Sequence, residues 1–295
     1  MTSLRFCPRS VIWNLVAALI LFGASGLWAQ NLNEEGQTGI FFTTFAYTVP
    51  SPKGGIGKPT LAYHYLAAGE VIGEFHTVSV TVGLLDRAEF GYTRNFHRSG
   101  DTPGLSPLWK DGFNILHSKV NMIRENQGKH KWVPAISAGF LVRMQDSNVS
   151  GTFVSQTKKY NNADFYVVAT KTVMLKVMPV IMTFGCKATN ASLLGLSGSA
   201  PGYKARLFGS LVLGLMGPAK SKLALATEIL QNPHDIKNVP GVSVPTTLVY
   251  ALRIFPLEKT KVNIDIGVAQ TVGKVAPGVD LKARSRLGLG ISYAF

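Results

Sequence analysis

The sequence predicts an all-β chain that forms an antiparallel transmembrane β-barrel of about twelve strands, with fourteen strands as the alternative. The first observation is the last ten residues, where apolar side chains at every second position oppose Gly, Ser or Ala. This two-residue period is typical of a β-strand with one apolar and one compact face. The second is that segments of about ten residues with the same alternation recur along the chain, as in membrane barrels. A soluble β-sandwich also alternates, but a content of 16% charged residues and an aromatic C-terminus favour the barrel.

The N-terminal residues have the order of a secretory signal peptide. Residues 1–9 carry two arginines and no acid, residues 11–22 are almost wholly apolar, and residues 23–29 are mostly small. The pattern predicts a signal peptide over residues 1–29, cleaved after Ala29 or Gly26, and a barrel over residues 30–295. A retained anchor is the alternative, although about a dozen apolar residues are short against the ~20 that a spanning helix needs. An exported barrel is expected in the outer membrane of a Gram-negative bacterium.

Thirteen segments are candidate strands. Ten of them follow residue 87 and can be assigned without conflict by working back from the C-terminus. Three more, over residues 38–49, 60–66 and 74–84, also look extended. Because single-chain bacterial barrels have even strand numbers, we favour twelve strands, with one N-terminal segment inside the barrel or in the periplasm.

The connections between these strands alternate in length. Short turns are expected around residues 86–87, 126–128, 174–176, 217–220 and 258–260. Longer polar links are expected over residues 98–112, 145–163, 189–202, 232–244 and 273–283. In barrels of this class the short turns face the periplasm and the long links face outside.

The charge balance is strongly basic, with a net charge of +14 for the whole chain. Without residues 1–29 the chain keeps 28 basic and 16 acidic residues. The basic residues are scattered, and no stripe or nucleic-acid motif accompanies them, so nucleic acid is not expected as a partner. We expect outer-membrane lipid, lipopolysaccharide phosphates, or a small anionic solute or glycan instead. One cysteine, Cys186, follows the signal peptide, so no intramolecular disulfide is expected.

The sequence offers no catalytic constellation, and we expect no cofactor, no metal and no enzymatic activity. Residues 54–60 partly match the motif of a phosphate-binding loop, but Pro59 occupies the position where that motif has Ser or Thr. No pair of histidines has metal-ligand spacing. His117 and Ser118 are neighbours, so on a strand they point to opposite faces and cannot pair. His64 with a distant serine stays open, and a lipid-modifying enzyme is a distant third hypothesis.

The interior of the predicted barrel is expected to carry charged side chains of both signs. The inward residues inferred from the alternation are Lys119, Arg143, Lys187, Arg206, Arg253, Glu89, Glu228 and Asp265. In one interpretation they pair across strands and fill the interior with salt bridges. In the other they line a narrow pore with a positive bias that favours anions. On the outer face, Trp132, Tyr250 and Tyr293 are predicted to lie near strand ends as girdle aromatics.

The C-terminus resembles the signal by which the barrel-assembly machinery recognises outer-membrane barrels, with Gly290, Tyr293 and Phe295 in the expected places. Gly288 departs from that signal, because a polar residue usually stands there. Gly39-Ile40-Phe41-Phe42-Thr43-Thr44 and Leu225-Ala226-Thr227-Glu228 resemble a Gram-negative outer-membrane β-barrel family of the domain-of-unknown-function type. The chain is also loosely similar to barrels associated with exopolysaccharide export and to hydrophobic-compound channels. The resemblance implies a barrel in the cell envelope and brings no catalytic residues.

Two functions follow as hypotheses. The first is a narrow passive channel for small, anionic solutes, whose selectivity depends on the charges of Lys119, Arg143 and Arg253. The alternative is a non-conducting structural or accessory barrel in envelope assembly or polysaccharide export. It would act through long links such as residues 145–163, which carry Lys158, Lys159 and Tyr160.

Overall fold

The computed structural model describes the chain from residue 31 to residue 295, with gaps. The gaps are residues 71, 102–105, 129, 152–153, 177, 192–194, 196–199, 219–220, 234, 237–238, 244–245, 257–260 and 273–285; side chains at 106–107, 149–158, 235–243 and 271–272 are also not described. The predicted signal peptide lies outside the described residues. None of the helices in the described part is long and apolar enough to cross a membrane.

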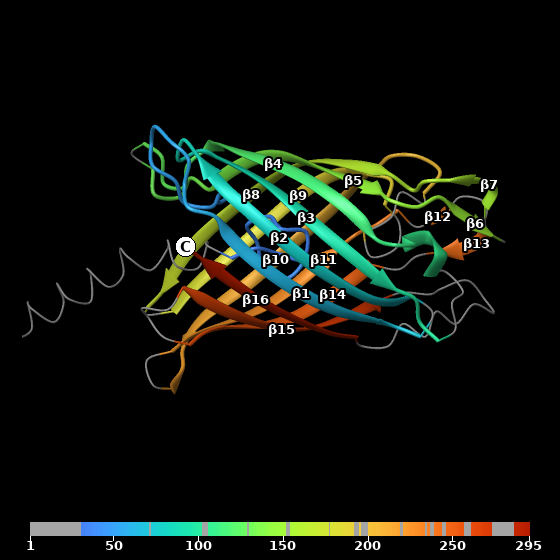
Figure 1. Cartoon of the computed structure of the whole chain (residues 1–295). Helices are drawn as coiled ribbons and strands as arrows, with labels where there is room; N and C mark the ends of the chain where they lie inside the picture. Colours follow the sequence, from blue (N-terminus) through green and yellow to red (C-terminus); the bar gives the residue numbers. More distant parts are fainter. Residues whose placement is uncertain are drawn as a thin grey trace, which may run out of the picture.

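Twelve antiparallel strands form a closed barrel, so the predicted fold class is confirmed and the fourteen-stranded alternative is wrong. The strands follow one another around the ring in chain order, and the last one closes it by pairing with the first (Figure 1). The barrel strands are β1 (Thr60–Gly69), β2 (Gly73–Leu84), β3 (Ala88–Arg98), β4 (Phe113–Ile123), β5 (Ala135–Gln145), β8 (Asn162–Leu175), β9 (Met178–Thr189), β10 (Lys204–Met216), β11 (Lys222–Leu230), β14 (Thr246–Phe255), β15 (Val262–Val272) and β16 (Arg286–Ala294).

The links differ between the two ends of the barrel, as predicted. Four short turns lie at one end together with a longer link between β4 and β5, over residues 124–134, where a short turn was predicted. At the turn after β2 both Leu85 and Asp86 have positive φ angles, 54° and 55°. The five long links lie at the other end, which also holds the short turn between β1 and β2. Two of the long links form small hairpins, β6 (Val149–Gly151) with β7 (Val154–Lys158), and β12 (Asp235–Ile236) with β13 (Val239–Ser243). The link from β3 to β4 holds a short 3-10 helix, η1 (Ser106–Trp109).

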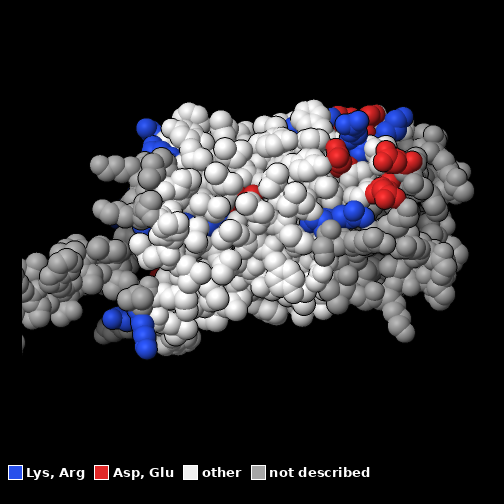
Figure 2. All heavy atoms as spheres, turned by 90° about the horizontal axis from the view of Figure 1, so that it is seen from below, with Lys and Arg blue, Asp and Glu red and all other residues white. Residues whose placement is uncertain are grey.

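The outer face of the barrel is an apolar belt. In β16, Leu287, Leu289, Ile291 and Tyr293 are exposed while the residues between them are buried or partly buried. Leu225 of β11 and Phe90 of β3 are likewise exposed. On the face in Figure 2 the acidic and basic residues gather toward the two ends, and the middle is almost free of them. Because a closed barrel satisfies its own backbone, this belt places the protein in an outer membrane.

The barrel encloses the N-terminal segment. Residues 31–49, here called the plug, lie within the ring of strands (Figure 1). The sequence predicted a segment of this region inside the barrel or in the periplasm, and the structure places it inside. The prediction of an extended segment over residues 38–49 was wrong. The plug is a series of tight bends with two isolated β-bridges, Leu32–Thr38 and Gly39–Thr44. Residues 50–59 then lead to β1.

Candidate functional site: the plugged lumen

All eight predicted lumen residues lie on the inward face of their strands. Six have buried side chains: Glu89, Lys119, Arg143, Glu228, Arg253 and Asp265. Lys187 and Arg206 are partly buried and lie close to the long-link ends of β9 and β10. The plug contacts the buried group from several sides, as the following clusters show.

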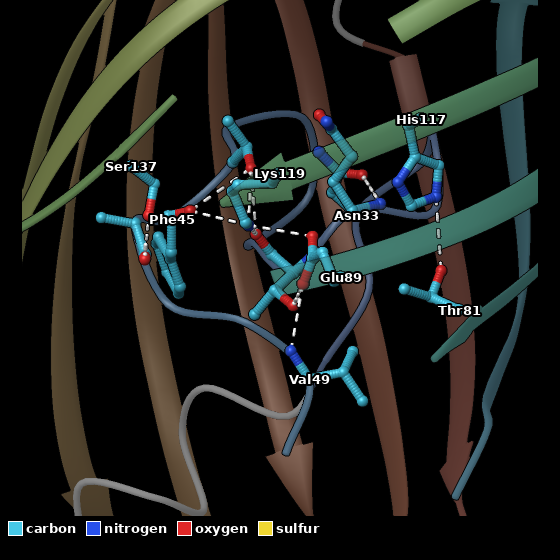
Figure 3. A network of polar contacts seen from close by, with 12 residues as sticks. Asn33, Phe45, Val49, Thr81, Glu89, His117, Lys119 and Ser137 are labelled. Atoms are coloured by element: carbon cyan, nitrogen blue, oxygen red, sulfur yellow. Dashed lines mark hydrogen bonds and ion pairs between the residues drawn. The ribbon is translucent and has the colours of Figure 1, made fainter. Parts of the chain in front are cut away.

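The first cluster joins β3 and β4 to the plug (Figure 3). The Lys119 ammonium lies 3.0 Å from Glu89 Oε1 and donates to the carbonyls of Thr38 and Phe45. The Glu89 carboxylate accepts from the backbone N–H of Thr38 and of Val49, both at 3.0 Å, and from the Thr38 hydroxyl. Both charges are fully buried, so each depends on the other and on the plug for its polar partners.

The second cluster is an anion nest formed by the plug backbone. The N–H groups of Phe41, Phe42 and Thr43 all donate to the Glu228 carboxylate of β11. Hydrogen bonds to a charged acceptor are stronger than neutral ones. Glu228 therefore acts as an anchor for the plug, and it has no basic partner in an ion pair among the described residues.

Two guanidinium groups complete the ion pairs. Arg253 of β14 binds both oxygens of Asp265 of β15, at 2.6 and 3.0 Å, and donates to the plug carbonyls of Gly39 and Ile40. Arg143 of β5 lies 2.5 Å from plug residue Glu35 and 3.0 Å from Asp164 of β8. The first interpretation of the lumen, salt bridges that fill the interior, thus describes this arrangement, with the plug as a further filler.

Neutral polar side chains of the wall also hold the plug. Ala46 alone is bound by three of them: Ser137 and Asn121 donate to its carbonyl, and its N–H donates to the Thr170 hydroxyl at 2.9 Å. Gln37 donates to the Tyr166 hydroxyl at 2.6 Å. The wall facing the plug is therefore rich in small polar groups.

The fold explains why a glycine occupies position 288. A Cβ atom added there would lie 2.2 Å from Cζ of Phe41, and one added to Gly267 would lie 3.1 Å from the same ring. The Phe41 ring thus packs onto a bare patch of backbone on β15 and β16. The place where the C-terminal signal departs from the usual pattern is the place where the plug needs room.

A pocket remains at the long-link end of the lumen. The plug supplies Glu35, Gln37, Phe42 and Thr44, and the wall supplies Leu141, Asp164, Tyr166, Lys187, Phe208 and Leu230. Asp164 and Lys187 are each two residues from the long-link end of their strand. The pocket combines aromatic rings, carboxylates and one ammonium group.

Two histidines that the sequence singled out, His117 and His64, are buried inside the barrel. His117 is buried with Nε2 3.3 Å from the Thr81 hydroxyl, while Ser118 donates to the Glu89 carbonyl, so the two neighbours do not pair. His64 is buried with Nε2 4.0 Å from Asp265, against the ring of Phe41. Within the described ranges, no group of three His, Cys, Asp or Glu side chains is arranged to hold a metal ion.

The three predicted girdle aromatics differ in their positions along the strands. Tyr293 is the second-last residue of β16, as predicted, whereas Trp132 is 72% exposed in the link from β4 to β5 and precedes the start of β5 at Ala135. Tyr250 faces outward but is the fifth of ten residues in β14, opposite Thr227 and Val268. Its place mid-strand follows from the start of β14 at Thr246, which the sequence did not mark.

The sequence did not predict that residues 31–49 would tie together so many wall residues. One signal was present: this stretch lacks the regular two-residue alternation of a barrel strand, and its charged residues are two acids, Glu34 and Glu35. A segment without strand alternation that precedes the first strand of a barrel can lie inside the ring or outside it, and the sequence did not distinguish the two. The contacts themselves depend on the closed ring.

No family model and no curated protein matches the chain. Among solved structures, an outer-membrane channel from Pseudomonas putida F1 is similar with a TM-score of 0.48 and 13% identity, over 85% of this chain and 98% of that one. A KdgM porin in complex with disordered oligogalacturonate has a TM-score of 0.44 and 9% identity, over 80% and 99%. Wzi, a carbohydrate-binding β-barrel of Escherichia coli involved in group 1 capsule assembly, has a TM-score of 0.29 and 12% identity, over 75% and 52%.

Proposed function

We propose that this protein is an outer-membrane channel for small solutes whose plug closes the lumen in the state described above. The observation that supports the proposal is the set of polar wall side chains that bind the plug, beside the apolar cluster that Ile40, Phe41 and Phe45 form with the wall. Ser137, Thr170 and Asn121 bind the plug through hydrogen bonds. Water can replace such bonds at a small net cost, because folding merely exchanges one set of polar partners for another. Once the plug moves, these polar groups would give the exposed wall a partly hydrophilic lining, together with the apolar side chains that had packed on Phe41 and Phe45.

The charges of the wall also support passage of a solute when the plug is displaced. Three wall cations would still form an ion pair with a wall carboxylate after the plug has left. These pairs are Lys119 with Glu89, Arg253 with Asp265, and Arg143 with Asp164. The plug carries no base, and its departure removes the Glu35 carboxylate that pairs with Arg143. Its departure therefore shifts the lumen toward positive charge, which favours small anions.

The test is single-channel conductance of the purified protein in planar bilayers, with and without a lock on the plug. Thr170 Oγ1 lies 2.9 Å from the Ala46 nitrogen. A pair of cysteines, Ala46→Cys with Thr170→Cys, in a background with Cys186→Ser and Cys7→Ser, can tether the plug to β8. We expect openings in the reduced protein, no openings after oxidation, and frequent openings with anion preference when residues 31–49 are deleted. The single variant Thr170→Cys is the matched control.

A non-conducting accessory barrel is the second candidate, and the density of plug contacts favours it. Glu228, Glu89 and Arg253 each make several bonds to the plug backbone. If the folded variant without residues 31–49 never conducts, the channel proposal is wrong and the accessory role takes its place. In either case we propose a function without catalysis.

A further inference from the structure

The inward face of β9 and β10 brings two cations together near the long-link end. Lys187 and Arg206 are directly opposite each other in the register of these strands. Like charges in opposite positions of an antiparallel pair are destabilising. Arg206 donates to the carbonyls of Asn232 and Ala205, and neither Lys187 nor Arg206 has a carboxylate within ion-pair distance among the described residues. An anion between them would relieve this repulsion.

The nearest acids do not fill that role. Glu35 and Asp164 line the same pocket as Lys187, but both are bound by the Arg143 guanidinium, at 2.5 and 3.0 Å. Lys187 is the one cation among the lining residues of the pocket, and neither pocket carboxylate lies within ion-pair distance of it. Arg206 lies outside the pocket lining, opposite Lys187 on β10.

A polar group without a partner lies beside the Lys187 ammonium. Lys187 Nζ and Asn232 Oδ1 are each 3.4 Å from the position that a Cβ on Gly195 would take. Asn232 is 1% exposed, and its Oδ1 accepts no hydrogen bond. A buried acceptor without a donor is costly, so a ligand that supplies a hydroxyl here would satisfy it.

The pocket that Lys187 lines supplies flat apolar surface next to Arg206 and Asn232, which lie outside its lining. Phe208, Tyr166 and Phe42 contribute rings, and Phe208 is two positions from Arg206 on the same face of β10. Aromatic rings next to polar groups suit a small body with apolar C–H faces and polar edges. A carboxylate, at least one hydroxyl and a compact ring or chain together describe the ligand.

We infer that the long-link end of the lumen is a binding site for a small hydroxylated carboxylate such as a sugar acid. Lys187 and Arg206 receive the carboxylate, Asn232 accepts from a hydroxyl, and Phe208 packs against the body of the ligand. This inference rests on the proposed channel function in one respect: the ligand is the solute that the channel admits. Because plug residues Gln37 and Phe42 form part of the pocket, the occupied site touches the plug directly.

The test is calorimetric titration of the purified full chain with D-glucuronate, with the plug in place. We expect saturable binding that becomes at least about tenfold weaker in Lys187→Met and in Arg206→Met, and that Lys187→Arg restores. Lys176→Met is the matched control, because Lys176 is exposed in a turn at the opposite end and should leave binding unchanged. Migration of the unheated barrel in electrophoresis verifies that each variant is folded.

Two further probes separate the parts of the inference. Glucose has the hydroxyls without the carboxylate, and cyclohexanecarboxylate has the carboxylate without the hydroxyls; both should bind at least about tenfold more weakly than glucuronate. Equal binding of either probe, or no glucuronate binding up to about 10 mM, overturns the inference. Binding without conductance would contradict the channel proposal alone, and plug-dependent conductance without binding would contradict this site alone.

Discussion

The contact between Phe41 and Gly288 allows a sharp test of how the plug is held. We predict that Gly288→Ala loosens the plug, because the new methyl group would lie 2.2 Å from the ring of Phe41. Phe41 is 1% exposed, and its backbone N–H is fixed by Glu228, so the ring has little freedom to move away. Overpacking of this kind costs about 1–3 kcal/mol. The milder contact at Gly267, at 3.1 Å, should make Gly267→Ala less harmful.

Thiol labelling of a cysteine in the plug measures this free energy. Ala46 is fully buried, so in a Cys7→Ser, Cys186→Ser background the Ala46→Cys thiol reacts only when the plug opens. A cost of about 1–3 kcal/mol should accelerate labelling roughly 5- to 150-fold. The control is Gly54→Ala, since a Cβ at Gly54 would meet nothing within 4 Å.

A double-mutant cycle decides whether the ring is the cause. Phe41→Ala alone should lower the free energy of plug opening by about 3–5 kcal/mol, because it leaves a buried cavity. In that background Gly288→Ala should have almost no further effect, since its clash has been removed. If the two effects add to within about 0.5 kcal/mol, the side chains do not interact and the packing argument is refuted.

Three further predictions use the same labelling assay. Glu228→Gln should open the plug by about 1.5–3 kcal/mol, because an amide offers one acceptor where the carboxylate binds three N–H groups; unchanged labelling would contradict the nest. Lys119→Met should cost about 3–5 kcal/mol by leaving Glu89 buried and unpaired, and adding Glu89→Gln should recover part of this loss; a double variant worse than the sum would contradict the pairing. Burial raises the pKa of the Glu34 carboxyl from 4.5 to about 8. The neutral form is therefore the bound one, and plug stability is full below pH 4.5 and is lost as the pH rises toward 8. Labelling, corrected for thiol reactivity in the unfolded protein, should accelerate over this range, and Glu34→Gln, which can still accept from Thr77, should remove the pH dependence.

The sequence alone determined the wall of this protein. Strict alternation in segments such as β2 and β16 predicts strands with one apolar and one small or polar face, because lipid and lumen are different solvents on the two sides of one sheet. The inward direction of residues such as Lys119 and Arg253 follows from that two-residue period. The even strand number came from the rule for bacterial barrels, and the order of short and long links came from the spacing between the alternating segments.

Only the tertiary structure decided what the wall encloses. Glu89 and Lys119 come from neighbouring strands, but their plug partners Thr38, Phe45 and Val49 are 40 to 81 residues away in sequence. The anion nest spans up to 187 residues. No period along the chain encodes such contacts, because they exist only when the ring closes around the plug. The position of Lys187 opposite Arg206 likewise depends on the register between β9 and β10. A shift of one residue in that register would place one of the two side chains on the other face of the sheet.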